Sequence, residues 1–269
     1  MNSRLPVIDR DASLPLLGVA IAYPSVGALE RIGPDWDWIW IDVQHGDLDL
    51  RETVSLIRAT DLIARPGLVR VPGQDPGWIG KVLDAGAAGV IVPMVESLEE
   101  AQAMVRAAKF PPIGNRSYGG RRVIDRLGRS YYKTANRDTV LILQVESNAA
   151  VELADRLAAL EGVDGLFLGP DDLLIRDGWD VDAPKDMKTI GRQSRHVGEC
   201  CRRHGKLSVC LGVSDATLAM AKEFGYRLVV GAGDVGFLAG GSKAAAQRLR
   251  AQFTAADAKL KEAPAKRGH

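Results

Sequence analysis

The sequence lacks the features that mark membrane, secreted and nucleic-acid-binding proteins. No apolar run approaches the ~20 residues that a membrane helix needs, and the first residues have no apolar stretch typical of a signal peptide. The net charge is +1, with acidic and basic residues interspersed, so there is no general attraction to nucleic acid or to an anionic membrane. The 3 cysteines have no metal-ligand spacing and cannot all pair, which favours a reducing cytoplasm.

The sequence is rich in short apolar runs that alternate with helix-like stretches. Such runs, apolar on both faces, are typical of buried parallel strands. The expected strands are residues 17–22, 38–43, 67–71, 89–92, 140–145, 165–168, 207–211 and 228–230. This alternation predicts an α/β fold, a (β/α)₈ TIM barrel formed by residues 1–240. An open doubly wound sheet is the alternative, but no Gly-rich phosphate-binding turn follows the first strand.

Several helices have clear boundaries in the sequence. Ser97 precedes a helix expected over 98–109, and Gly225 ends one expected over 215–224. A further helix is expected over 149–160, with Asn148 as its cap.

Three segments depart from the regular alternation. Residues 113–138 are rich in Gly and Arg and predict a long loop, either functional or interfacial. Residues 176–188 form a second, polar insertion. Residues 243–262 predict an amphipathic helix because apolar positions recur at helical spacing. We expect residues 241–269 to form this helix, packed on another subunit, and a tail whose last residues, 264–269, are frayed. The apolar positions of the helix are Ala246, Leu249, Phe253, Ala256 and Leu260.

Two carboxylates follow neighbouring strands. Glu146 comes directly after the strand at 140–145, and Asp172 follows the strand at 165–168, with a helical stretch between them. A right-handed crossover places both at the carboxyl end of the barrel, where parallel α/β folds do their chemistry. Two oxygen ligands without a helper Cys or His predict a Mg²⁺ or Mn²⁺ site left open for substrate.

Asp42 and His45 lie at the end of the second expected strand. A carboxylate near an imidazole can fix its tautomer and raise its basicity, as a general base requires. The alternative is that Asp42 caps a turn and that His45 satisfies it. Their place on the same rim as the two carboxylates favours catalysis.

Arg70 ends the third strand among apolar residues. A guanidinium there needs an anion, which is either a substrate oxyanion or an ion-pair partner such as Asp42 or Asp84. Asp84 precedes the fourth strand and so lies at the opposite end, which makes it at most a supporting or interface residue. The residues 231–234, Gly-Ala-Gly-Asp, follow the last strand, where barrels can bind phosphate, but a structural turn is the preferred interpretation.

These motifs resemble the HpcH/HpaI aldolase family, metal-dependent class II aldolases that use pyruvate. The resemblance covers most of the chain, residues 17–238. It rests on Ile41-Asp42-…-His45, Val69-Arg70, Val92-Pro93-Met94-Val95, Lys109-Phe110-Pro111-Pro112-…-Gly114-…-Arg116, Gln144-Val145-Glu146 and Gly162-Val163-Asp164-Gly165-…-Gly169-Pro170-…-Asp172-Leu173.

The resemblance implies a homo-oligomeric barrel, a hexamer or trimer, whose C-terminal helices exchange between partners. It implies Glu146 and Asp172 as ligands of a divalent cation, Mg²⁺ or Mn²⁺, with Co²⁺ as a third candidate. Gln144 would contact the bound 2-oxo acid. The amides of the turn Gly169-Pro170-Asp171-Asp172 would hold the pyruvate carboxylate.

The resemblance also implies the proton chemistry. Arg70 would stabilise the pyruvate enolate, and His45, oriented by Asp42, would move the proton of the aldol hydroxyl. Many family aldolases carry Glu directly before this histidine, whereas this chain has Gln44, which cannot act as an acid or base. A Gln-His pair also occurs in relatives that include a macrophomate-synthase-like branch, so the carbon acceptor stays open.

The predicted reaction is cleavage of a 4-hydroxy-2-oxo acid to pyruvate and an aldehyde, by a carbon–carbon lyase without a Schiff-base lysine. The alternatives are oxaloacetate decarboxylation with enolate coupling, a CoA-ester lyase, and a non-catalytic scaffold. The aldehyde pocket is expected at Val19, Ile21, Tyr23, Leu211 and Gly212. The Arg-rich segment would either favour an acidic aldehyde or pair with a neighbouring subunit.

Overall fold

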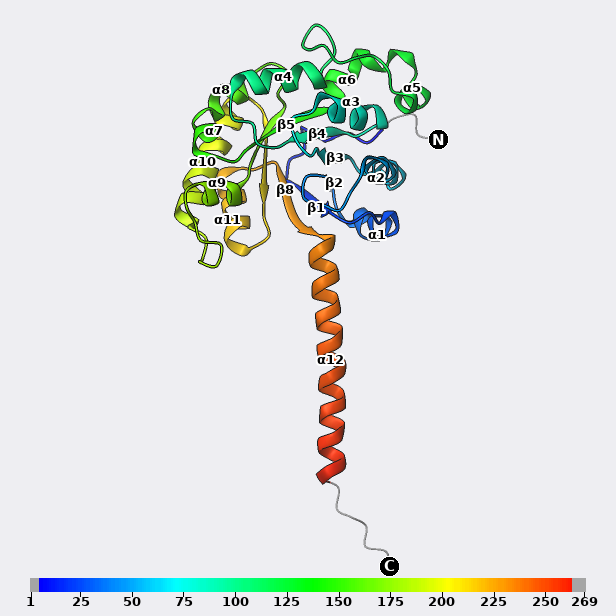
Figure 1. Ribbon diagram of the computed structural model, residues 1–269, viewed down its shortest axis with the longest axis vertical. Coiled ribbons are helices and arrows are strands. Elements are labelled where there is room, and N and C mark those ends of the chain that lie inside the picture. The colour runs from blue at the N-terminus through cyan, green and yellow to red at the C-terminus, as the bar shows by residue number, and fades with distance from the viewer. Residues whose placement is uncertain (1–4, 263–269) are drawn as a thin grey trace, which may run out of the picture.

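The computed structural model describes residues 5–262, and the side chains of residues 5–254, as a closed barrel with one long helix projecting from it (Figure 1). Each strand pairs in parallel with the next, and β8 closes on β1. The strands are β1 (Leu16–Ile21), β2 (Trp38–Asp42), β3 (Gly67–Arg70), β4 (Gly89–Val92), β5 (Val140–Val145), β6 (Gly165–Leu168), β7 (Leu207–Leu211) and β8 (Leu228–Gly233). The predicted (β/α)₈ barrel is therefore confirmed.

Helices surround the barrel in chain order (Figure 1). They are α1 (Val26–Ile32), α2 (Leu50–Leu62), α3 (Pro76–Ala85), α4 (Leu98–Ala108), α5 (Arg121–Leu127), α6 (Tyr132–Asp138), α7 (Asn148–Glu152), α8 (Ala154–Ala159), α9 (Pro170–Arg176), α10 (Met187–Arg203), α11 (Asp215–Phe224) and α12 (Asp234–Glu262), with short 3₁₀ turns at Gly33–Asp35 and Arg129–Tyr131. Within the described residues, no helix is both long and apolar enough to cross a membrane.

Strand alternation separates two hydrophobic layers. Residues such as Ile39 and Ile41 pack with helix residues in the main core, whereas Trp40 and Phe167 belong to a second cluster made almost entirely of strand residues. The rings of Trp40 and Phe167 meet edge to face with centroids 5.4 Å apart. This second cluster fills the barrel interior. Polar side chains that point inward at the strand ends therefore pack against its apolar residues.

The polar layer follows from that parity. Asp42 is two residues after Trp40, and Arg70 is two residues after Leu68, so both side chains share the inward direction of those apolar residues. The β2–β3 register places Asp42 directly opposite Arg70. Gln144 and Glu146 continue the same parity along and beyond β5.

The expected helix over 149–160 is instead two helices that meet at Leu153. The cap is also different from the one predicted: Ser147, not Asn148, accepts a hydrogen bond from the Ala150 amide, at 3.0 Å. The Ser97 cap and the left-handed Gly225 at the end of α11 are as expected.

The Arg-rich segment 113–138 contains α5 and α6 rather than a continuous loop. It leads from α4 into β5 and therefore lies at the amino ends of the strands. Arg122 pairs with Asp61 at 2.8 Å and Arg116 pairs with Asp84 at 2.8 Å. These contacts keep the segment and Asp84 away from the carboxyl ends within this chain. The acidic-aldehyde and subunit-pairing interpretations of the segment, and Asp84 as a supporting or interface residue, therefore stay predictions.

The long C-terminal helix begins earlier than predicted, at Asp234 directly after β8. Asp234 accepts hydrogen bonds from the amides of Ala22 and Tyr23, at 3.1 and 3.0 Å, and so fixes the start of the loop after β1. Residues 231–234 thus end β8 and begin α12, and they do not form the separate turn that was expected. The side chains of Ala256 and Leu260, and the tail 264–269, lie outside the described residues.

Candidate active site

Glu146 and Asp172 meet at the carboxyl ends of two paired strands. Glu146 follows β5 directly, and Asp172 lies in the first turn of α9, which begins right after β6. Glu146 is 0% exposed, and among the described residues neither of its carboxylate oxygens has a hydrogen-bond partner of ordinary geometry. Burial, together with the negative charge of Asp172, raises the pKa of Glu146 to about 7, although the charge of Arg70 opposes the shift.

This arrangement fits a divalent cation. A buried carboxylate with two unpartnered oxygens is costly unless a positive charge compensates it. The part of the chain that the structure describes contains no group of three or more His, Cys, Asp or Glu suited to a metal. The protein would therefore supply two oxygen ligands, with water and substrate as the others, which suits Mg²⁺ or Mn²⁺. Binding would displace the proton that Glu146 holds near neutral pH.

Gly169 makes room for these side chains. A Cβ at this position would lie 2.7 Å from Cγ of Glu146 and 2.9 Å from Nε2 of Gln144. Any larger residue would push one of them aside. The role of glycine here is therefore steric, because its backbone φ of −95° is open to other residues.

Arg70 is held rigidly beside the two carboxylates. Its Nε and one terminal nitrogen donate to the two oxygens of Asp42, at 2.8 and 2.7 Å, and both residues are buried. The other terminal nitrogen lies 3.5 Å from Oε1 of Gln144. The guanidinium also sits 4.6 Å from the ring centroid of Trp40. A fork held by a bidentate carboxylate is preorganised to receive an anion.

The predicted Asp42–His45 dyad stays a prediction, because the side chains of Asp42 and His45 make no hydrogen bond to each other in this structure. Both oxygens of Asp42 are taken by Arg70, and His45 contributes only its backbone amide, at 3.4 Å from Asp42 Oδ1. The side chain of His45 is exposed on the rim, and its ring makes no hydrogen bond to the described residues. A bidentate, charge-assisted pair across the β2–β3 register holds both oxygens of Asp42 and so determines the orientation of its carboxylate.

The turn after β6 offers fewer amides than the sequence suggested. The Gly169 amide donates to the Val145 carbonyl at 3.0 Å, and Pro170 has no amide hydrogen. Only the first-turn amides of Asp171 and Asp172 remain for a ligand in this turn. The carboxylate of Asp171 pairs with Lys185 on the surface.

The other predicted residues divide between the rim and the core. Leu211 ends β7 and packs against the barrel interior, and Tyr23 is exposed after β1. Val19 and Ile21 are fully buried against the helices, so they cannot line an aldehyde pocket. Gln44 is half-buried beside His45, and its buried Oε1 has no hydrogen-bond partner in the described part of the chain.

Sequence reasoning missed Glu96, Ser147 and Arg176. Glu96 lies four residues after β4 and contacts both of the others. The signal that identified Glu146, an acidic residue soon after a buried strand, was present for Glu96 as well. Its partners are 51 and 80 residues away in the sequence, so no local pattern indicates them.

The sequence profile of the HpcH/HpaI aldolase/citrate lyase family matches residues 28–220. The chain belongs to this family. The predicted family is therefore confirmed, and with it the assignment of the chain to a class of carbon–carbon lyases, because its relatives are named aldolases.

Relatives of this family member include two curated aldolases and a solved structure. The 4-hydroxy-2-oxovalerate aldolase of Novosphingobium aromaticivorans is 41% identical over 60% of this chain, and the match spans only 62% of that relative. The hydroxypyruvate/pyruvate aldolase of Roseovarius nubinhibens is 33% identical over 83% of this chain and 88% of its own. A crystal structure of a family protein from Burkholderia cenocepacia superposes with a TM-score of 0.79, 32% identity and 90% and 96% coverage of the two chains.

Proposed function

We propose that this protein is a divalent-cation-dependent pyruvate aldolase, which reversibly cleaves a 4-hydroxy-2-oxo acid to pyruvate, or a substituted pyruvate, and an aldehyde. The observation that carries the proposal is the buried carboxylate of Glu146, unpartnered at both oxygens, beside Asp172 and the braced guanidinium of Arg70. The names of the relatives supply the reaction class.

Each side chain has a distinct task in this reaction. The cation held by Glu146 and Asp172 would be Mg²⁺, Mn²⁺ or Co²⁺, and it supplies Lewis acidity toward the 2-oxo acid. Arg70 donates to the oxygen on which negative charge develops when the C3–C4 bond breaks. Gln144 and the amides of Asp171 and Asp172 orient the oxo acid and its carboxylate.

The chemistry does not need an amine nucleophile from Lys109. That buried lysine is bonded to Asp164 at 2.6 Å, at the amino ends of the strands. Burial lowers its pKa, but the ion pair keeps it away from the rim.

The function is tested with metal-free protein reconstituted with Mg²⁺, Mn²⁺ or Co²⁺. Pyruvate is supplied with a panel of aldehydes, aldol products are measured, and oxaloacetate is assayed separately as a decarboxylation substrate. We expect cation-dependent products with at least one aldehyde. Decarboxylation without any aldol product would favour the oxaloacetate alternative, and full activity in excess chelator would contradict the cation-dependent mechanism.

His45 is predicted to matter for only one of these reactions. Its exposed imidazole on the rim can accept the hydroxyl proton that leaves during aldol cleavage, whereas oxaloacetate decarboxylation has no such proton. We expect His45→Ala to lose aldol cleavage by ~10²–10⁴ and to keep most decarboxylase activity. Both rates are measured on the same preparation at saturating cation. Equal loss of both activities would contradict the proton-transfer role.

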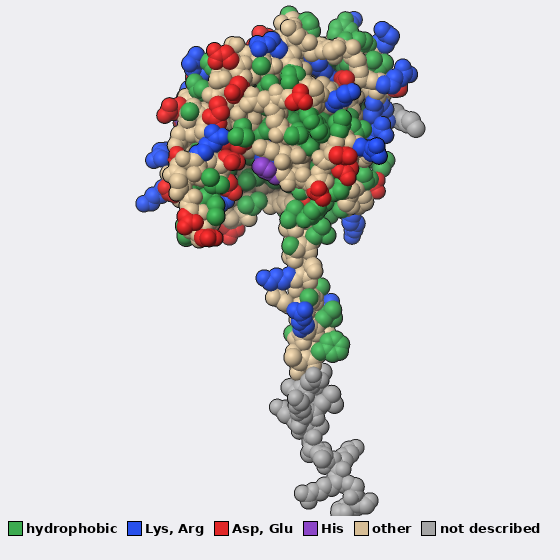
Figure 2. All heavy atoms as spheres, in the orientation of Figure 1, with side chains coloured by type: hydrophobic (Ala, Val, Ile, Leu, Met, Phe, Trp, Pro, Cys, Tyr) green, Lys and Arg blue, Asp and Glu red, His purple; other side chains and the backbone are tan. Residues whose placement is uncertain are grey.

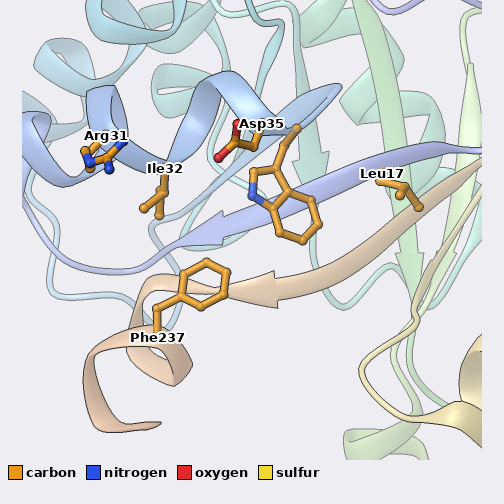
Figure 3. Close-up of a pocket in the computed structure, with 6 residues that line it drawn as sticks. Leu17, Arg31, Ile32, Asp35 and Phe237 are labelled. Atoms are coloured by element: carbon orange, nitrogen blue, oxygen red, sulfur yellow. The ribbon is translucent and has the colours of Figure 1, made fainter. Parts of the chain in front are cut away.

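The same proposal includes a homo-oligomer, a hexamer or trimer, in which α12 packs on another copy. Leu249 and Phe253 on the described part of α12 are 48% and 73% exposed, and the helix stands clear of the barrel (Figure 2). Phe237 at its root borders an open apolar cavity of about 530 Å³ with Leu17 and Trp36 (Figure 3). Such a large exposed apolar surface is typical of an interface.

The oligomer is expected to dissociate when the helix loses its apolar face. Leu249→Glu with Phe253→Glu should reduce the mass measured by light scattering after size-exclusion chromatography to that of a smaller species. Gln252→Glu, at an exposed position of the same helix, is the control and should keep the wild-type mass. An unchanged mass in the double variant would exclude α12 as the interface.

We place the protein in the cytoplasm as part of this proposal. Cys200, Cys201 and Cys210 are all buried free thiols, which fits a reducing compartment. Burial raises the pKa of both Cys201 and Cys210 to about 12, so neither is a reactive thiolate.

A further inference from the structure

Glu96 links the two segments that carry the carboxylate pair. Its Oε2 accepts a hydrogen bond from the hydroxyl of Ser147 at 2.5 Å, and its Oε1 pairs with Arg176 at 2.9 Å. Ser147 is the residue directly after Glu146. Arg176 lies four residues after Asp172 in α9, so the two share one side of that helix.

The backbone of Glu96 is itself fixed. Its amide donates to Oε2 of Glu100 at 2.7 Å, and Gln74 contacts the same carboxylate at 3.3 Å. Gln74 also donates to the carbonyl of Met94 at 2.7 Å. Met94 is a non-glycine residue with a φ of +57°, a conformation that persists only where its surroundings hold it.

Ser147 cannot easily exchange Glu96 for another partner. Its hydroxyl oxygen accepts a hydrogen bond from the Ala150 amide as the cap of α7, and the same hydroxyl donates a hydrogen bond to Glu96. The hydroxyl is therefore used in both directions and is buried. Its position fixes the start of α7 and, one residue earlier, the backbone of Glu146.

We infer that Glu96 is a positioning residue that sets the separation of Glu146 and Asp172 for the cation. This inference rests on the proposed function. The two carboxylates lie on different segments and repel each other when both are charged. A contact from elsewhere in the chain is therefore needed to hold the two segments at a fixed separation. Glu96 supplies that contact, because its carboxylate, in the loop after β4, binds both Ser147 and Arg176.

The test is the affinity of the metal-free protein for Mn²⁺, measured by titration calorimetry. Residues that orient metal ligands typically change metal affinity ~10–100-fold, and we expect that loss for both Glu96→Gln and Arg176→Ala. The two substitutions change the charge in opposite directions. Simple electrostatics would make Arg176→Ala bind Mn²⁺ more tightly, so weaker binding in both variants indicates positioning.

Two variants sharpen the comparison. Arg176→Lys keeps the positive charge and should recover most of the affinity. The double variant Glu96→Gln/Arg176→Ala should lose no more Mn²⁺ affinity than the single variant that binds Mn²⁺ less tightly. Both substitutions break the same Glu96–Arg176 bridge, so their effects should not add. Glu99→Gln makes the same charge change at an exposed neighbouring position and should bind as the wild type does.

Thermal unfolding of the metal-free variants provides a second readout. The Glu96–Arg176 pair is partly exposed, and such pairs contribute little to stability, so the unfolding temperature should stay near that of the wild type. Turnover should recover at saturating Mn²⁺, because the ligands themselves are intact.

The outcomes separate this inference from the proposed function. Wild-type Mn²⁺ affinity in Glu96→Gln and Arg176→Ala would overturn the positioning role while leaving the function standing. Equal weakening in Glu99→Gln would also overturn it. Failure of the wild type to bind any of Mn²⁺, Mg²⁺ and Co²⁺, or binding unaffected by Glu146→Gln, would overturn both.

Discussion

Glu146→Gln and Asp172→Asn are expected to abolish turnover by removing cation binding while the barrel stays folded. Each variant deletes one of two protein ligands, so the affinity loss should exceed the ~10–100-fold typical of residues that only orient ligands. Metal content after dialysis and turnover of each purified variant are the measurements. Asp182→Asn is the control, because that carboxylate is exposed in the loop after α9. Full turnover of Asp172→Asn in excess chelator would contradict the assignment.

Glu146→Gln is also expected to change the stability of the metal-free protein. A pKa raised to about 7 means that Glu146 binds its proton more tightly in the folded state than in the unfolded state. The contribution of Glu146 to metal-free stability is therefore most favourable at low pH and falls as the pH rises from the ordinary Glu value through 7. Glu146→Gln should remove this dependence and stabilise the metal-free protein by on the order of 3 kcal/mol at pH 8. Urea unfolding at several pH values measures it.

Arg70→Ala is expected to slow aldol cleavage and oxaloacetate decarboxylation together, by ~10²–10³. Both reactions develop negative charge on the same oxygen, so one braced guanidinium serves both. The opposite result, a wild-type rate of decarboxylation, would remove Arg70 from the site chemistry. Steady-state rates for both substrates at saturating cation make the comparison.

Stability must be separated from catalysis in this variant. Loss of Arg70 leaves Asp42 buried without its partner, and breaking a buried pair typically costs ~3–5 kcal/mol. Arg70→Lys keeps the charge but cannot make the two-pronged bond to Asp42 or also reach Gln144. We expect it to fold and still to lose most activity, with circular dichroism as the check.

Asp42 now has a role different from the one that its spacing to His45 suggested. Asp42→Asn should weaken the brace on Arg70 and therefore slow both reactions, rather than aldol cleavage alone. The D-x-x-H spacing is equally compatible with a catalytic dyad and with a carboxylate that faces a neighbouring strand. The β2–β3 register adds the second possibility, because it pairs Asp42 with Arg70.

The sequence by itself determined the barrel and the location of its chemistry. Short buried runs and helix caps are local signals, so the strands and the polar residues at their carboxyl ends, Glu146, Asp172 and Arg70 among them, could be predicted from the printed residues. Local signals also explain the errors in α7 and α8, where Ser147 and Asn148 are both plausible caps and only the hydrogen bond to Ala150 distinguishes them.

Only the tertiary structure decided which of these residues touch. The pairing of Asp42 with Arg70 and the bridge from Glu96 to Ser147 and Arg176 join segments far apart in the chain. The burial of the Glu146 carboxylate, which has no hydrogen-bond partner among the described residues, likewise depends on the packing of distant segments. Arg122 and Arg116 lie in a segment whose composition suggested a site for an acidic aldehyde. In the structure they pair with Asp61 and Asp84, which lie at the amino ends of the strands. Contacts of this kind depend on strand register and helix packing, which local residue patterns do not encode.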